Sequence, residues 1–166
     1  MLAAATVTVI LAAMPIDAAA KPSQKVVTAT IAGKRFRPTR RLVQLTANGG
    51  TIGFSALGQK LARPGGTIKT LYVACAVLLT GRTFPFTSTD CLTNYSETKV
   101  SRHPSMKIWS DIVIGQTAVT FDSYDGTQIA GSFHAVVPAG PSNPGLPTIT
   151  VDGAFHGPFQ QGNPNR

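Results

Sequence analysis

Apolar and polar side chains alternate residue by residue in two segments near the C-terminal end, 128–137 and 148–155. A period of two is typical of a β-strand that packs one face and leaves the other in water. The same pattern predicts a strand over 117–123, and the turn signal at 124–127 (YDGT) predicts that it forms a hairpin with 128–137. The Pro/Gly-rich stretch 138–147 cannot lie inside a sheet, so it predicts a connector.

Further strands are predicted in the first half of the chain, where β-branched stretches are separated by Gly-, Asn- or Pro-containing turns. These segments are 25–32, 35–37, 42–46, 51–57 and 68–79. The last has the length of a strand or of a short helix, and its Val, Ile and Tyr content favours the strand. Segment 80–104 is the least patterned, and we expect a long loop there with one short strand.

Roughly eight short strands at spacings near ten residues predict an all-β fold, a single antiparallel β-sandwich. A lipocalin-like or partly open β-barrel is the alternative. A chain with 13% charged residues, 16 Gly and 12 Pro does not have the composition of a helical bundle. The side chains predicted to point inward are Val119, Phe121, Ile129, Phe133, Ala135, Ile149, Val151 and Phe155. Those predicted to point outward are Thr120, Asp122, Gln128, Ser132, His134, Thr150, Asp152 and His156.

A Gly-x-Phe step occurs in each of the last two predicted strands, at Gly131 and Phe133 and again at Gly153 and Phe155. Both glycines have inward parity. A glycine inside a strand marks a bulge or a close approach of another group, so each is predicted to admit a ring from the neighbouring strand or to form a bulge.

The motifs ATIAGK at 29–34, TFDSYDGTQIAGSF at 120–133 and TITVDGAF at 148–155 resemble small exported bacterial β-domains of unknown function. In those families a hairpin with a Gly-x-Phe step precedes a final strand of the type Val-x-Gly-x-Phe. The resemblance covers part of the chain near both ends and implies a β-sandwich in the cell envelope. It implies no activity and no functional residues.

Residues 1–20 form an apolar run that ends in three alanines. Small residues at such a position suit signal peptidase, so the run is predicted to be a signal peptide cleaved before Lys21. No basic residue precedes the run, and a buried N-terminal strand or helix is the alternative. The domain is predicted to span 21–157, with a flexible tail at 158–166. It is expected to be exported, to the periplasm or the cell exterior, without a transmembrane segment after signal removal.

Two cysteines, Cys75 and Cys91, are predicted to form one disulfide, because an even cysteine count in an exported chain favours oxidation. Two free thiols are the alternative. The bridge would close a loop of about 15 residues and stabilise the fold by about 3 kcal/mol in the chain-entropy model. Neither a Cys-x-x-Cys pair nor a neighbouring His suggests zinc.

Charge is distributed unevenly in a chain of formal net charge +8, with eleven Lys or Arg and no acid between residues 18 and 89. The densest group, Lys34, Arg35, Arg37, Arg40 and Arg41, is a candidate site for an anionic envelope polymer or lipid headgroups. A solvated surface without a partner is the alternative. Nucleic acid is disfavoured, because its readers interleave bases with stacking aromatics and only Phe36 lies inside the group.

No catalytic or cofactor motif is recognisable, and no cofactor is predicted. His134, Asp152 and His156 have outward parity, and could hold a divalent metal if the last two strands pair in a suitable register. Scattered surface polar residues are the alternative. Asp122 and Asp125 flank a turn, where Asp usually bonds the local backbone rather than acting in catalysis.

The leading functional hypothesis is therefore a non-catalytic binding or structural module of the envelope that uses its basic surface. A lipocalin-like carrier of a small apolar ligand is the second hypothesis. A metal-dependent enzyme using the C-terminal histidines is the third.

Overall fold

The structure is a computed structural model of the chain, and it describes residues 24–39, 43–46, 54–60, 65–111 and 116–159. These residues form strands joined by turns and loops, without a helix. The strands are β1 (Val26–Ile31), β2 (Lys34–Phe36), β3 (Gln44–Thr46), β4 (Phe54–Lys60), β5 (Thr67–Cys75), β6 (Phe86–Ser88), β7 (Cys91–Lys99), β8 (Ser105–Ser110), β9 (Thr117–Tyr124), β10 (Gln128–Val137) and β11 (Ile149–Pro158).

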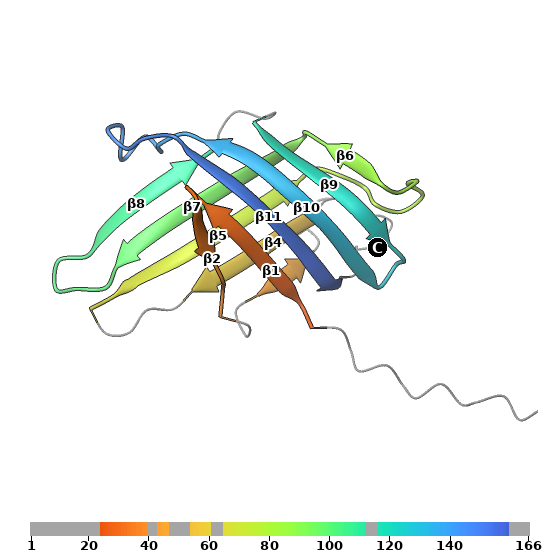
Figure 1. Cartoon of the computed structure of the whole chain (residues 1–166), viewed down its shortest axis with the longest axis horizontal. Coiled ribbons are helices and arrows are strands. Elements are labelled where there is room, and N and C mark those ends of the chain that lie inside the picture. Colours follow the sequence, from red (N-terminus) through yellow and green to blue (C-terminus); the bar gives the residue numbers. More distant parts are fainter. Residues whose placement is uncertain (1–23, 40–42, 47–53, 61–64, 112–115, 160–166) are drawn as a thin grey trace, which may run out of the picture.

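Two antiparallel sheets pack face to face, and this confirms the predicted all-β sandwich (Figure 1). The first sheet has the strand order β2-β1-β11-β10-β9-β6, and the second has the order β3-β4-β5-β7-β8. Figure 1 shows the strands of one sheet crossing those of the other at a steep angle. In the described residues the two sheets are separate ladders, so they are not closed into the barrel considered as the alternative.

The hydrophobic core lies between the sheets, and period-two patterning places its side chains. All eight side chains predicted to point inward are buried, with exposed fractions of 7% or less. The eight predicted to point outward are exposed or partly exposed. Removing apolar surface from water, at roughly 25 cal/mol per Å², is what holds the two faces together.

The two Gly-x-Phe steps interlock across the β10–β11 pair. Gly131 lies directly opposite Phe155, and Phe133 lies directly opposite Gly153. A Cβ added at Gly131 would lie 2.5 Å from Phe155 Cζ, and one added at Gly153 would collide with Phe133 Cζ. The register between β10 and β9 also shifts at Gly131. Both glycines thus admit a ring as predicted, and the predicted bulge is found at Gly131 but not at Gly153.

Segment 80–104 is not the long loop that its weak patterning predicted. It contains β6 and the nine-residue β7, which lies between β5 and β8 in the second sheet. The alternation in β7 is hidden because Thr93 and Glu97 occupy inward positions that a pattern search expects to be apolar. Segment 68–79 is a strand as predicted, although β5 already ends at Cys75.

The predicted disulfide joins Cys75 to Cys91, which face each other at the end of the β5–β7 ladder. Both residues are buried. The bridge holds the ends of these two central strands of the second sheet together and closes the loop that carries β6 into the first sheet.

The connector at 138–147 runs along the outer edge of β8. The backbone N–H of Gly140 donates to the carbonyl of Ile108 at 2.8 Å, and the backbone N–H of Ser110 donates to the carbonyl of Pro138 at 3.1 Å. The backbone N–H of Ile108 donates to the side-chain Oδ1 of Asn143 at 2.9 Å. An edge strand presents unpaired donors and acceptors, and here the connector occupies those of Ile108 and Ser110.

The folded body reaches slightly past the predicted domain boundary at residue 157. Phe159 is buried, its N–H donates to the carbonyl of Thr127 at 2.7 Å, and its ring packs edge-on against Tyr124. The predicted signal segment 1–20 and most of the predicted tail lie outside the described residues.

Candidate anion-binding site

The register of the second sheet aligns side chains in rows across its inner face. One row, which we call the apolar row, contains Gly58, Leu71, Tyr95 and Trp109, each directly opposite the next on β4, β5, β7 and β8. Leu71, Tyr95 and Trp109 are buried, with exposed fractions of 0%, 4% and 7%. This row closes one end of the core.

The next row outward on the same face is charged. Lys60 lies opposite Lys69, Lys69 opposite Glu97, and Glu97 opposite Lys107. Each of these residues is two positions along its strand from a member of the apolar row, so both rows face the first sheet. The charged row holds three cations and the only Glu of the chain. Like charges directly opposite each other destabilise a sheet, and the Lys60–Lys69 pair is of that kind.

A cavity of about 340 Å³ opens where the charged row approaches the edge of the first sheet, and we call it the rim pocket. Its lining residues are Ile31, Ala32, Lys34, Arg35, Phe36, Lys60, Lys69, Tyr95, Glu97, Trp109 and Ile149. The first sheet contributes the residues of β1, β2 and β11, and the second contributes those of β4, β5, β7 and β8. Four cations and one carboxylate therefore line a pocket with an aromatic and aliphatic floor.

Glu97 is held by two partners inside the rim pocket. Lys69 Nζ lies 2.7 Å from Glu97 Oε1 in an ion pair, and the Tyr95 hydroxyl donates to the same oxygen at 2.7 Å. Partial burial alone would raise the pKa of Glu97, but the hydrogen bonds from Lys69 and Tyr95 and the charges of Lys69 and Lys107 lower it. Burial, together with the bond to Glu97, raises the pKa of Tyr95. Glu97 is therefore a carboxylate whose charge is already compensated.

The aromatic floor has its polar atoms engaged elsewhere. The Trp109 indole N–H donates to the carbonyl of Pro147 at 2.9 Å, and the Tyr95 hydroxyl is bonded to Glu97. The Tyr95 ring packs against Trp109 with centroids 5.5 Å apart, and against Phe36 edge-on at 6.4 Å. These residues consequently present ring carbon to the pocket.

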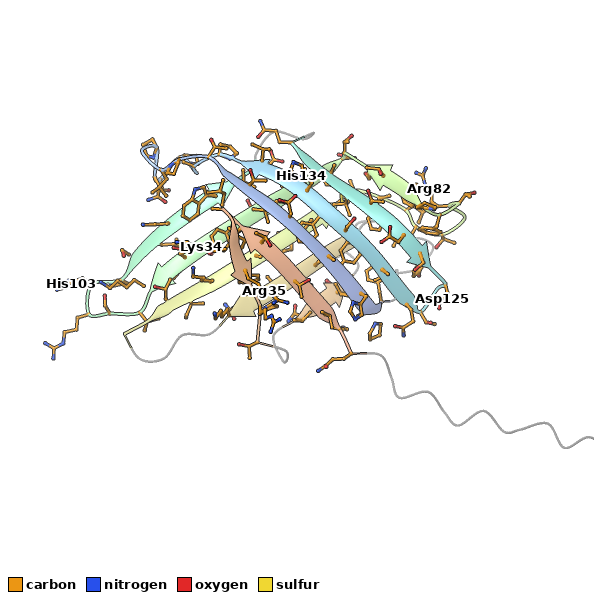
Figure 2. The ribbon with its side chains drawn as sticks, viewed as in Figure 1. Lys34, Arg35, Arg82, His103, Asp125 and His134 are labelled. Carbon is orange, nitrogen blue, oxygen red and sulfur yellow. A yellow bond between two sulfur atoms is a disulfide. The ribbon has the colours of Figure 1, made fainter. Side chains whose placement is uncertain are left out.

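Three residues of the predicted basic group are described, and all three are exposed. Lys34 and Arg35 lie on the three-residue edge strand β2 and line the rim pocket; Figure 2 labels both. Arg35 and Arg37 line a second cavity of about 300 Å³, together with Pro38, Val43 and residues of the β1 segment. Arg40 and Arg41 lie outside the described residues.

Of the three residues considered as metal ligands, two meet. His134 lies opposite Asp152 on β10 and β11, with His134 Nδ1 and Asp152 Oδ1 2.6 Å apart on the outer face of the first sheet. His156 lies opposite Ala130, four residues along β10 from His134. Among the described residues, no group of three His, Cys, Asp or Glu side chains is placed to hold a metal ion.

Asp125 has the local role predicted for a turn residue. Its Oδ1 accepts hydrogen bonds from the backbone N–H of Gln128 at 2.7 Å and from the N–H and hydroxyl of Thr127 at 2.8 and 2.9 Å. These bonds, that of Gln128 first, lower the pKa of Asp125. Asp122 is exposed nearby on β9. The turn thus explains Asp125 without catalysis.

A buried polar cluster lies at the other end of the second sheet's inner face. The Thr117 hydroxyl donates to Asp111 Oδ2 at 2.8 Å and lies 3.1 Å from the Thr93 hydroxyl. The Asp111 N–H donates to the carbonyl of Thr93 at 2.9 Å. All three residues are buried. Because its polar atoms bond to one another, this cluster fastens β7, β8 and β9 together.

The charged row and the aromatic floor were missed from the sequence. A weak signal exists, since an inward Tyr or Trp lies two residues from a charged residue in both Tyr95–Glu97 and Lys107–Trp109. Only the register of β5, β7 and β8 brings the two pairs beside Lys69. That register cannot be derived from a pattern that predicts a loop over 80–104.

Comparison with family models, curated proteins and solved structures finds no match to this chain. The resemblance to exported bacterial β-domains therefore stays a prediction. Among the residues that the structure describes, none forms a helix of the length and apolarity that crossing a membrane requires.

Proposed function

We propose that this chain is an exported, non-catalytic binding module that recognises anionic groups through the basic residues around β2 and the rim pocket. The observation that carries the proposal is the convergence of Lys34 and Arg35 from the first sheet with Lys60 and Lys69 from the second around one cavity. Only one of these cations, Lys69, has a carboxylate bound to it among the described residues. Such a cluster produces a positive potential that attracts anions and orients them.

Export is part of the same proposal. It is supported by the signal-like segment 1–20 and by the Cys75–Cys91 disulfide, since disulfides persist mainly in oxidising compartments. Outside the cytoplasm, phosphate groups are the abundant anions of both lipid headgroups and envelope polymers. Phosphate is therefore the shared chemistry that we expect the basic residues to bind.

The test measures binding of the full chain to vesicles containing phosphatidylglycerol and, separately, to soluble polyphosphate, at increasing salt. The triple variant Lys34→Ser, Arg35→Ser and Arg37→Ser should weaken binding by about tenfold at low salt, with a smaller difference at high salt. The matched control removes three exposed cations elsewhere, in Arg82→Ser, Lys99→Ser and Arg102→Ser.

An equal loss of affinity in the two triple variants would mean that net charge alone is responsible, and would refute a site at β2. Binding to vesicles but not to polyphosphate would identify the lipid headgroup as the source of the phosphate. The reverse result would identify the polymer.

The carrier hypothesis lacks the closed barrel that it started from, because the two sheets stay separate in the described residues. What favours a small ligand is the aromatic floor of the rim pocket, which lies at an open end of the sandwich rather than inside a barrel.

A further inference from the structure

We infer that the rim pocket binds a small amphipathic anion, an aromatic carboxylate or sulfonate. Its acidic group lies between the cations of the two sheets, and its ring lies on the floor of Phe36, Tyr95 and Trp109. The inference rests on the proposed anion-binding function. Beside the phosphate groups expected at β2, it adds a small ligand held in the pocket itself.

The position of the acidic group follows from the charged row. Lys60 and Lys69 face each other across β4 and β5, which costs stability unless a negative charge lies between or above them. Glu97 accompanies Lys69 on its other side and also faces Lys107, so it does not neutralise Lys60 as well. An anion at the mouth of the pocket would complete the charge balance of this row.

The first sheet adds a second pair of cations to the same mouth. Lys34 and Arg35 line the pocket from β2. A monoanionic acid therefore meets donors on both walls, one from each sheet.

The ring is inferred from the floor. The Tyr95 hydroxyl donates to Glu97, and the Trp109 indole N–H donates to the carbonyl of Pro147. Both residues therefore offer the ligand ring carbon and no hydrogen bond. Ile31 and Ile149 supply the facing wall from the first sheet. A flat ring packs on aromatic neighbours at favourable distances.

The volume limits the size of the ligand. A cavity of about 340 Å³ lies at the lower end of the range for small-molecule pockets, roughly 300 to 1,000 Å³. It therefore suits one or two fused rings with an acidic substituent rather than a long acyl chain.

The experiment titrates the full chain with 2-naphthalenesulfonate, methanesulfonate and 2-naphthalenemethanol, by calorimetry and by NMR. The chain contains one Trp, so the single indole N–H signal reports directly on the floor of the pocket. We expect 2-naphthalenesulfonate to bind about tenfold more tightly than methanesulfonate or 2-naphthalenemethanol. We also expect it to shift the Trp109 indole signal.

Two variants test the position of the acidic group. The double variant Lys34→Gln and Lys60→Gln removes one cation from each wall and leaves the Lys69–Glu97 ion pair intact. It should lower the affinity for 2-naphthalenesulfonate by about tenfold. The control Arg82→Gln and Arg102→Gln, which removes two cations outside the pocket, should change its affinity less than about twofold. Figure 2 shows Arg82 at the opposite side of the molecule from Lys34.

The outcomes separate this inference from the proposed function. If methanesulfonate binds as tightly as 2-naphthalenesulfonate and both are weakened in the Lys34/Lys60 variant, the anion site stands and the aromatic ligand is refuted. If 2-naphthalenesulfonate binds without shifting the indole signal, the inference is also refuted. It is refuted as well if 2-naphthalenemethanol binds as tightly as 2-naphthalenesulfonate. If no anion binds and the vesicle and polyphosphate assays are negative, both proposals fail.

Discussion

The β10–β11 pair of the first sheet and the charged row of the second sheet both lie on inner faces, yet they are built in opposite ways. At β10–β11, glycine lies opposite phenylalanine twice, and the rings fill the space that a side chain would occupy. In the charged row, Lys60, Lys69, Glu97 and Lys107 stand side by side at the rim of the inner face, where Lys60 and Lys107 are exposed.

The difference separates a structural need from a feature that packing does not explain. The glycine–phenylalanine pairs contribute to a filled core, since close-packed interiors tolerate neither voids nor extra atoms. The charged row contributes no apolar burial, and its Lys60–Lys69 pair opposes folding. The row is therefore where we look for function.

The largest effect is expected from filling the space at β10–β11. Gly153→Ala should lower the free energy of unfolding by about 3 kcal/mol, because the new Cβ would collide with the Phe133 ring and lie 2.5 Å from the carbonyl oxygen of Thr28. Chemical denaturation measures the change. The matched control, Gly145→Ala, adds a Cβ with no atom within 4 Å and should change stability far less. Equal effects in the two variants would show that the ring does not need the space.

A smaller pair of effects with opposite signs is expected in the charged row. Lys69→Gln should lower the free energy of unfolding by about 1 kcal/mol at low salt, because Glu97 loses its partner at 2.7 Å. Lys60→Gln should raise it by about 0.3 kcal/mol, because one of two facing cations is removed. Denaturation of both variants in parallel measures the difference. A loss of stability in Lys60→Gln would mean that Lys60 has a structural role and would remove the contrast with β10–β11.

The smallest effect is expected in the dependence on pH. The pKa of Glu97 is lowered in the folded chain from an ordinary value of 4.5, so its stabilising contribution is complete above that value and is lost as the pH falls through the folded-state pKa. The stability difference between the wild type and Glu97→Gln should therefore be present at neutral pH and vanish in acid. Denaturation at several pH values checks this. A difference that stays constant down to about pH 3 would mean that the carboxylate charge contributes nothing.

Most of the first sheet could be predicted from the sequence because its buried positions, Thr117 apart, are apolar residues or glycine. Phe121, Phe133 and Phe155 each have inward parity within their own strand, and Asp125 and Gly126 mark the turn between two of these strands. Each strand of that hairpin could be recognised alone, so the fold class followed without knowledge of the register.

The candidate site could be predicted only in part, because it depends on contacts between distant strands. Lys34 and Arg35 were found by their density in the sequence. Lys60, Lys69 and Glu97 were not, because each is an isolated charge in its own segment. Register between strands is set by packing across the sheet rather than by local sequence, and this row appears only after four strands are placed.

The connector at 138–147 has a consequence for self-association. It covers the outer side of β8 at Ile108 and Ser110, where another chain would otherwise add a strand. In the described part of the chain the edge strands β2, β3 and β6 are each three residues long. A sheet whose unpaired edges are this short offers another chain little backbone to pair with, so it resists assembly into fibres. The connector, which forms no strand of its own, therefore limits the addition of further chains to this edge.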